Sequence, residues 1–408
     1  MPKLGDMAHI SKALKKVSER ISAQEAGGLN ERTAQTIVDA LRSGTAPING
    51  AALLAVGREQ LIKTIQQDLN RASIGKSSFR ILNGHIGMGK TLTLRMLQDY
   101  AFRLGFATSF VTLTSRECPL YDMRAVYEHI VKGLRVNDCR DRPALEWILE
   151  NWANRVRDDL RTTNTAPWSF WELNPPFKEI LAIYFEAVSH NHFVRAEKAL
   201  SWINGDMRAI QDAKKMGIHT VVTSDNALEM LGNTTRMIRE LGLRGLVILL
   251  DEAETIPSIC TVARSSQAIC NLDMLAGAAG RTPYSDFVYA TTPYFLKYIA
   301  STGIKMHIPP ERLITLENLS DSELTDLALK IKEIYVRAYG WQGDSRIKDA
   351  NLKKLVLACL GQQKVRVTPR LIVRSVVKCM DLCCDSPEVS FDEIMDSLLK
   401  TLNSDNNN

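Results

Sequence analysis

One glycine-rich octapeptide constrains this chain more than any other stretch of its sequence. It has the spacing G-x-x-x-x-G-K-T and contains Gly84, Gly87, Gly89, Lys90 and Thr91. Glycines let the backbone bend tightly and turn its N–H groups inward, where the positive end of a following helix also attracts anions. In such a loop the lysine reaches the β- and γ-phosphates and the hydroxyl holds Mg2+. The spacing therefore predicts a loop that binds the phosphates of a nucleotide.

The sequence on both sides of this loop supports the prediction. A short apolar strand over Phe79–Asn83 enters the loop, and a helical pattern over Lys90–Leu104 leaves it. A chance glycine turn would not need either flank. The residues expected to contact the nucleotide here are Gly84, His85, Ile86, Gly87, Met88, Gly89, Lys90, Thr91 and Leu92.

A pair of acidic residues directly follows an unbroken apolar run. The run is Leu246–Leu250, and its length and composition are typical of a strand buried on both faces of a parallel sheet. Asp251 is expected to hold the Mg2+ shell with Thr91, and Glu252 to orient the attacking water as the base. Glu254 is a competing base whose position fits less well. The alternative is an ordinary surface turn after a core strand.

Hydroxyl and guanidinium groups complete the predicted chemistry. Thr291 or Thr292, at the end of the predicted strand Phe287–Thr291, can contact the γ-phosphate or the water, and Thr291 is favoured. The alternative is a plain strand end before a proline turn. Charge on the γ-phosphate also requires an arginine, from the same chain or from a neighbour. Arg312 and Arg370 are the candidates, although each alone resembles an ordinary surface arginine.

Strand and helix patterns alternate through the middle of the chain. Five strands are expected, and this alternation predicts a doubly wound parallel sheet of α/β class. The strands are expected at 79–83, 107–113, 246–250, 287–291 and 313–316. The predicted organisation is a helical region over 1–48, a core over 49–317 with a helical insertion at 135–222, a helical lid over 318–402 and a disordered tail over 403–408.

In this order the motifs resemble the AAA+ division of P-loop (ASCE) ATPases, near its origin-initiator and clamp-loader branch. The resemblance covers roughly residues 50–385 and implies an oligomer with ATP between subunits and Arg312 acting in a neighbour's site. The matching segments are Gly57-Arg58-Glu59 (adenine-side box), Gly84–Thr91 (Walker A), Leu246–Glu252 (Walker B), Thr291 or Thr292 (sensor 1), Glu311-Arg312-Leu313 (arginine finger) and Thr368-Pro369-Arg370 (sensor 2).

A narrower resemblance is to the BREX-system ATP-binding proteins (BrxD-like) of prokaryotic phage-defence islands. It is carried by Ala40–Gly57, the phosphate loop, Glu117–Asp122 with Val126-Tyr127, and Leu243–Glu252. That family often has Ser where Thr91 stands, and the segment after Pro293 is short here. The resemblance implies an ATP-hydrolysing motor or switch that uses ATP and Mg2+ and has other defence proteins as partners. A nucleotide-gated scaffold and a transposition or replication loader are the alternatives.

Composition limits the remaining possibilities. A net charge of +5, from 51 basic and 46 acidic residues, permits DNA contact through a local patch but does not require it. The candidate patch is the basic cluster Arg346, Lys348, Lys353, Lys354, Lys364, Arg366, Arg374 and Lys378, which is otherwise a solvated helix face. The eight cysteines show no metal-binding spacing. Neither a signal segment nor a membrane span is expected, so the predicted location is cytoplasmic.

Overall fold

The structure of the chain is a computed structural model that describes residues 29–140, 142–159, 172–252, 261–277, 281–304, 306, 309–340, 345–361 and 367–404. The competing base Glu254 lies outside these residues, as do Lys364 and Arg366 of the basic cluster. Residues 405–408 of the expected tail lie outside them as well. The chain divides into two compact units. We call Gln60–Ile86 with Tyr100–Leu316 the sheet unit, and Met1–Glu59 with Gly87–Asp99 and Glu317–Asn408 the helical unit.

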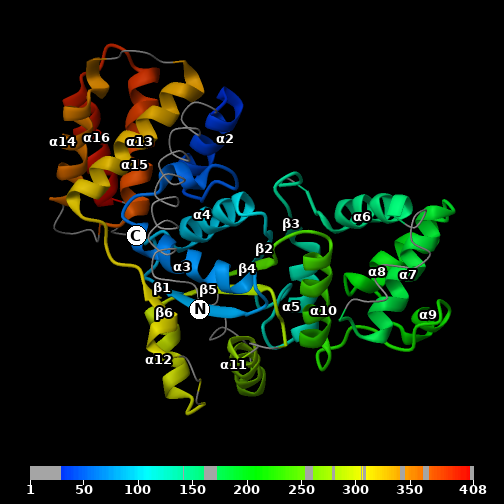
Figure 1. Cartoon of the computed structure of the whole chain (residues 1–408). Helices are drawn as coiled ribbons and strands as arrows, with labels where there is room; N and C mark the ends of the chain where they lie inside the picture. The colour runs from blue at the N-terminus through cyan, green and yellow to red at the C-terminus, as the bar shows by residue number, and fades with distance from the viewer. Residues whose placement is uncertain are drawn as a thin grey trace, which may run out of the picture. The chain divides into compact units, whose positions relative to one another are not determined.

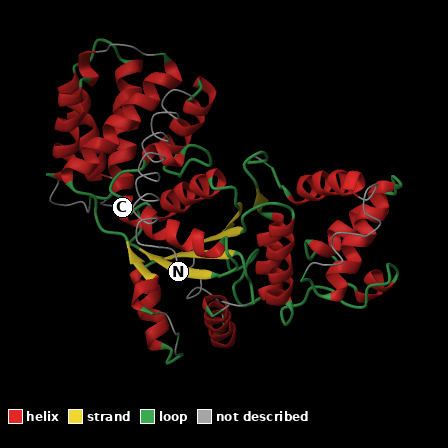
Figure 2. Ribbon diagram, in the orientation of Figure 1, coloured by secondary structure: helices red, strands yellow, loops and turns green. Residues whose placement is uncertain are grey.

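The described residues of the sheet unit form a six-stranded sheet, drawn in yellow in Figure 2. The strand order is β3-β2-β4-β5-β1-β6, and every pairing is parallel except that of β3 with β2. All five predicted strands are confirmed, but the predicted count is one too low because β3 has only two residues and therefore no readable pattern. The strands are β1 Ser78–Asn83, β2 Ala107–Thr112, β3 Leu134–Arg135, β4 Leu246–Asp251, β5 Ser285–Thr291 and β6 Leu313–Thr315.

Side chains alternate between the two faces of this sheet. Phe79 and Tyr289 share one face, where their rings stack at 6.4 Å, together with Phe287. That face packs in one core with α5 (Met123–Lys132), α10 (Ala227–Glu240), α11 (Val262–Ala276) and α12 (Pro293–Ser301). Arg80 lies on the other face and pairs there with Asp68 of α3 (Glu59–Ala72). Helices on both faces explain why β4 and β5 are buried along their whole length.

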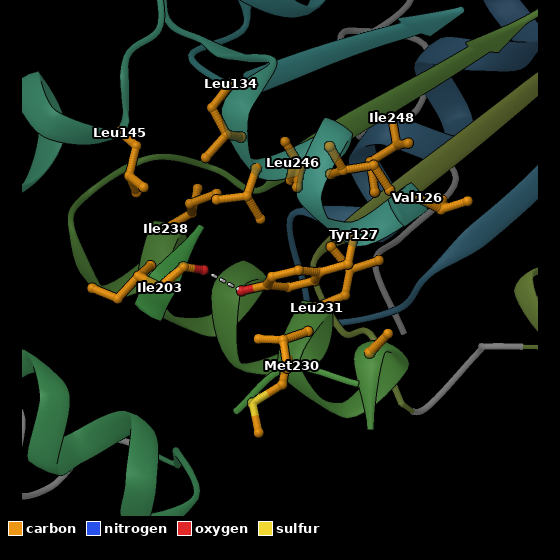
Figure 3. Close-up of a cluster of buried hydrophobic side chains, with 14 of the residues drawn as sticks. Val126, Tyr127, Leu134, Leu145, Ile203, Met230, Leu231, Ile238, Leu246 and Ile248 are labelled. Carbon is orange, nitrogen blue, oxygen red and sulfur yellow. Dashed lines mark hydrogen bonds between the residues drawn. The ribbon is translucent and has the colours of Figure 1, made fainter. Parts of the chain in front are cut away.

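The predicted insertion is helical and shares the core of the sheet. Figure 3 shows Tyr127 of α5 beside Leu231 of α10, with its hydroxyl donating to the Ile203 carbonyl at 2.6 Å. A buried phenol needs such an acceptor, and here the bond joins helices that are distant in the sequence. The insertion helices are α6 Leu145–Asp159, α7 Pro175–Ser189, α8 Phe193–Ile203 and α9 Ile210–Lys214.

The helical unit has a core of its own (Figure 1). Its N-terminal helix α2 (Glu31–Arg42) packs against α13 and α15, although about 300 residues separate them along the chain. Ile37, Val38 and Leu41 carry this contact and are buried, as their helical spacing predicts. The C-terminal helices are α13 Asp321–Tyr339, α14 Asp349–Leu360, α15 Pro369–Asp385 and α16 Phe391–Ser404. No helix in the described part of the chain is long and apolar enough to span a bilayer.

A buried carboxyl lies at the amino end of β5. Asp286 is fully buried and accepts a hydrogen bond from the Ser78 hydroxyl at 2.5 Å. Burial raises the pKa of Asp286 to about 7, and the nearby Asp68 carboxylate raises it further. Between its ordinary pKa and this value the folded chain holds a proton that the unfolded chain has lost. Stability is therefore greatest at low pH and falls as the pH rises toward 7.

This sign gives a testable expectation for Asp286→Asn. The amide carries no charge to desolvate, so the variant should be more stable than the native chain at pH 8 and close to it at pH 4. A shift of about three pKa units corresponds to an upper limit of about 4 kcal/mol. Thermal unfolding of both proteins at pH 4, 6 and 8 measures the difference. An equal difference at every pH would contradict the assignment.

Candidate functional site

The carboxyl ends of β1, β4 and β5 meet at one edge of the sheet, and each of these strands ends in or is followed by a predicted site residue. Asn83, the last residue of β1, pairs with Thr291 of β5, and the Gly84 N–H donates to the Thr291 carbonyl at 3.1 Å. Asp251 ends β4, where its carbonyl accepts from Leu113 N–H at 2.9 Å. The first residue of the phosphate loop is thus held beside Thr291 by backbone bonds.

The two predicted acids differ in backbone conformation. Asp251 continues the strand and is 4% exposed. Glu252 has a φ of 59°, in the left-handed region that costs an L-residue with a side chain roughly 1–2 kcal/mol. Strain of this kind in a non-glycine residue is common at functional sites, although Asn191 and Tyr284 also have positive φ values here. The observation favours a role for the Glu252 side chain over an ordinary surface turn.

The hydroxyl groups of Thr291 and Thr292 have different surroundings. Thr292 caps α12, where its Oγ1 accepts from the Phe295 N–H at 3.4 Å. Thr291 is fully buried, and its Oγ1 finds no hydrogen-bond partner among the described residues. The Thr292 hydroxyl already caps a helix, whereas the Thr291 hydroxyl has no hydrogen-bond partner in the described part of the chain. This difference favours Thr291 over Thr292 as the residue that contacts a ligand.

The remainder of the phosphate loop belongs to the helical unit and follows Ile86 directly along the chain. Gly87 and Gly89 have φ values of 82° and 86°, which residues with a Cβ rarely adopt. Lys90 and Thr91 begin α4 (Lys90–Arg103), whose first turn is closed by a 2.8 Å bond from Thr93 N–H to the Gly89 carbonyl. The loop therefore opens a helix N-terminus, which is the geometry that binds phosphate.

Two predicted arginines lie around this part of the loop. The backbone N–H of Arg370, in the first turn of α15, donates to the Gly87 carbonyl at 3.3 Å. A Cβ added at Gly87 would meet the Thr368 Oγ1 at 3.0 Å, so the N-terminus of α15 lies against the loop. Arg58 donates through Nη2 to the Met88 carbonyl at 3.3 Å. Both arginines thus donate hydrogen bonds to backbone carbonyls of the loop, Arg370 from its own backbone and Arg58 from its side chain.

Arg312 lies away from the edge that carries Asp251 and Thr291. It precedes Thr315, which pairs with Asn83, by three residues, and so starts about 10 Å back along the sheet. Its Nη1 donates to the Ala276 carbonyl at the end of α11, at 3.2 Å. The structure therefore does not bring Arg312 to the acids and threonine of its own sheet.

Comparison with known proteins decides the family. The model of the BREX system ATP-binding protein BrxC/D family matches residues 29–170 and 166–398, which is most of the chain. The chain belongs to this BrxC/D family. The resemblance to BREX ATP-binding proteins is thereby confirmed, and the α/β fold class inferred from the sequence is confirmed by the mostly parallel sheet. An ATP-binding protein accounts for the glycine-rich loop.

Other comparisons add little. No curated protein matches the chain closely enough to count as a relative. Among solved structures, the Aeropyrum pernix ORC2 protein in its ADPNP-ADP complexes is 11% identical, with 84% of this chain and 67% of that chain covered and a TM-score of 0.45. Its ADP form is 14% identical, with 84% and 68% covered and a TM-score of 0.43. These scores are too low to carry the fold assignment.

The basic cluster and the absence of metal-binding spacing were the other two expectations from the sequence. Arg346 of the basic cluster is a structural clamp in this BrxC/D-family chain: it donates to the Cys383 carbonyl at 2.6 Å and to the carbonyls of Val389 and Ser386. Lys354 pairs with Asp392 at 2.7 Å. No group of three or more His, Cys, Asp or Glu side chains in the described residues can hold a metal. A nucleotide-bound Mg2+ needs only one or two carboxylates, because phosphates and water fill its shell.

Sequence reasoning missed Asn83. It is 7% exposed, and its side-chain Oδ1 has no partner among the described residues. The available signal was a polar residue at the end of an otherwise apolar strand, one position before the phosphate loop. Its register with Thr291 cannot be inferred without the sheet order.

Proposed function

We propose that this BrxC/D-family protein hydrolyses the ATP it binds, with Mg2+, and does so as an oligomer. The observation that carries the proposal is the shared carboxyl edge of β1, β4 and β5. There Asp251 and Thr291 end neighbouring strands, and Thr291 is bonded to the first residue of the phosphate loop. Acids at the end of a buried strand serve hydrolysis, whereas phosphate binding alone does not need them.

Each residue has a role in this proposal. Lys90 and the loop N–H groups bind the phosphates, while Thr91 and Asp251 hold Mg2+, which would neutralise the charge that develops on the phosphate oxygens. Glu252 takes a proton from water, whose oxygen attacks the γ-phosphorus while the bond to the bridging oxygen of ADP breaks. Thr291 contacts the γ-phosphate. The burial of Asp251 and Thr291 at strand ends and of Lys90 at a helix start supports their part of this assignment.

The helical unit is proposed to sense the nucleotide. Arg58 would contact it on the adenine side and Arg370 at its phosphates. Support comes from the bonds of Met88 to Arg58 and of Gly87 to Arg370. Gly57 is left-handed and packed against Glu323, where an added Cβ would lie 2.2 Å from the carboxylate Oε1, so the backbone before Arg58 is held tightly. The Ser320 N–H lowers the pKa of that Glu323 carboxyl.

Arg312 is proposed to act in a neighbouring subunit, because it lies back from the edge of its own sheet. Arg312→Ala and Lys90→Ala chains should each be inactive alone. A 1:1 mixture should regain roughly a quarter of native turnover, since a quarter of its interfaces join an intact loop to an intact arginine. Phosphate release from the two variants, alone and mixed, measures this.

The control for the mixture is the double variant Lys90→Ala with Arg312→Ala. Mixed with Arg312→Ala it creates no interface that has both groups, so turnover should stay at background. Equal activity in the two mixtures, or none in either beside an active native chain, would show that Arg312 does not act across subunits.

The match to the BREX family model supports a role in phage defence, and we propose a DNA-associated motor or switch in a complex with other defence proteins. ATP turnover by the whole chain in magnesium buffer, with and without duplex DNA, tests this. Glu252→Gln is the reference that binds ATP without turnover. A native chain no faster than this reference would contradict hydrolysis and favour a nucleotide-gated scaffold. Turnover that ignores DNA would contradict the DNA association.

A further inference from the structure

Two buried polar side chains sit side by side at the edge of the sheet where the phosphate loop begins. Asn83 ends β1 and Thr291 ends β5, and the two residues pair in register. In parallel strands, residues in register point to the same face. Asn83 is 7% exposed and Thr291 is fully buried. The pair therefore forms a small polar patch that the fold keeps out of bulk water.

One side-chain oxygen of each residue in this patch has no hydrogen-bond partner in the described part of the chain. Asn83 Oδ1 and Thr291 Oγ1 both lack a hydrogen-bond partner there. Below them on the same face, Ile81 and Tyr289 belong to the buried hydrophobic core. The backbone carbonyls of Asn83 and Thr291 already have partners, since Leu316 N–H donates to the first and Gly84 N–H to the second. Two such atoms at adjacent positions are costly, which indicates that a ligand completes them.

Hydrogen-bond chemistry identifies that ligand. A side-chain carbonyl oxygen only accepts, and phosphate oxygens also only accept, so Asn83 Oδ1 needs a donor such as water. Leu250 pairs with Tyr289 and so lies on the face that carries Thr291. Asp251, the proposed magnesium ligand, is the next residue and therefore lies on the opposite face. Glu252 comes next along the chain, at the end of the strand that neighbours β5. A water beside Asn83 therefore lies on the side of the sheet away from the expected metal.

We propose that Asn83 binds the attacking water, an inference that rests on the hydrolysis proposed above. Its Oδ1 accepts one hydrogen of the water and Glu252 removes the other as a proton, so that the oxygen lone pair is directed at the γ-phosphorus. Thr291 Oγ1 donates to a γ-phosphate oxygen. The oxygen–phosphorus bond forms as the bond to ADP breaks, and the products are ADP and inorganic phosphate. Asn83 adds no charge and transfers no proton.

Asn83→Leu tests this role because leucine has nearly the same size and no polar atom. ATP and ADP affinity should stay within about threefold of native, while kcat falls about 10- to 100-fold, as when one oriented group is removed from a reaction centre. The unfolding temperature should hold or rise, because an unsatisfied buried atom is gone. Affinity for ADP with aluminium fluoride, which mimics the attacked phosphate, should fall in proportion to kcat.

Asn271→Leu is the matched control. Asn271 is also buried, at 2% exposed, but its Nδ2 donates to the Leu120 carbonyl at 2.8 Å and its Oδ1 accepts from Gln267. The same change there should lower the unfolding temperature and spare the ratio of aluminium fluoride affinity to ADP affinity. Native turnover in Asn83→Leu, or a fall in kcat that merely follows lost stability, would overturn the inference while leaving hydrolysis intact. Absence of turnover in the native chain would instead refute the proposed function.

Discussion

Replacing Lys90 with alanine is expected to abolish ATP binding. Lys90 is the first residue of α4, directly after the glycines of the loop, and is 8% exposed. A charge-assisted contact to two phosphates in a partly dry site is among the strongest a side chain makes. Loss of at least about 100-fold in affinity is expected, which is about 3 kcal/mol. Titration calorimetry with ATP measures it.

The design must separate lost binding from lost folding, because Lys90 is buried. Lys90→Met keeps the length and packing of the stem without the charge and should lose affinity to the same extent as alanine. Lys353→Ala, on the exposed side of α14 and outside the loop, is the matched control and should bind as the native chain does. Binding of ATP by Lys90→Met within about threefold of native would show that the lysine is not a phosphate ligand.

The central strand of this fold can be predicted from the sequence, because a parallel strand buried on both faces tends to be a continuous run of apolar residues. The run Leu246–Leu250 is typical of a strand covered on both faces of a sheet, and β4 is found there. By contrast, β3 consists of two residues, Leu134 and Arg135, whose pairing with β2 depends on the chain having turned back. A pattern needs several residues to be a pattern, so such a strand cannot be predicted.

The packing of α2 against α13 and α15 also cannot be predicted from local sequence patterns. The apolar stripe of α2 predicts that it is buried but not against what, since its partner begins at Asp321. The sequence does distinguish the two threonines at the end of β5. Thr292 followed by Pro293 is a helix start, with a capping threonine before a first-turn proline. That signal alone separates the capping hydroxyl from Thr291.

Changing Glu252 to glutamine should leave ATP bound and unhydrolysed. Glutamine has the size and reach of glutamate but cannot take the proton of the attacking water, so turnover should fall about 10²- to 10⁴-fold. ATP affinity should change little, because the loop and Lys90 are untouched. Single-turnover phosphate release and ATP titration on the same preparation separate the two quantities. Hydrolysis at the native rate would show that Glu252 is not the base.

The backbone of Glu252 supplies a second variant that distinguishes chemistry from structure. At a φ of 59°, glutamate and glutamine carry the same strain, whereas glycine carries almost none. Glu252→Gly should therefore unfold at a temperature equal to or higher than that of the native chain, with a free energy of unfolding up to roughly 1 kcal/mol larger. Its turnover should fall as far as that of Glu252→Gln. A stabilised and inactive glycine variant means that the chain tolerates this strain for the sake of the carboxylate. If the glycine variant is instead less stable, Glu252 is held there by contacts of its own, and the left-handed backbone says nothing about catalysis.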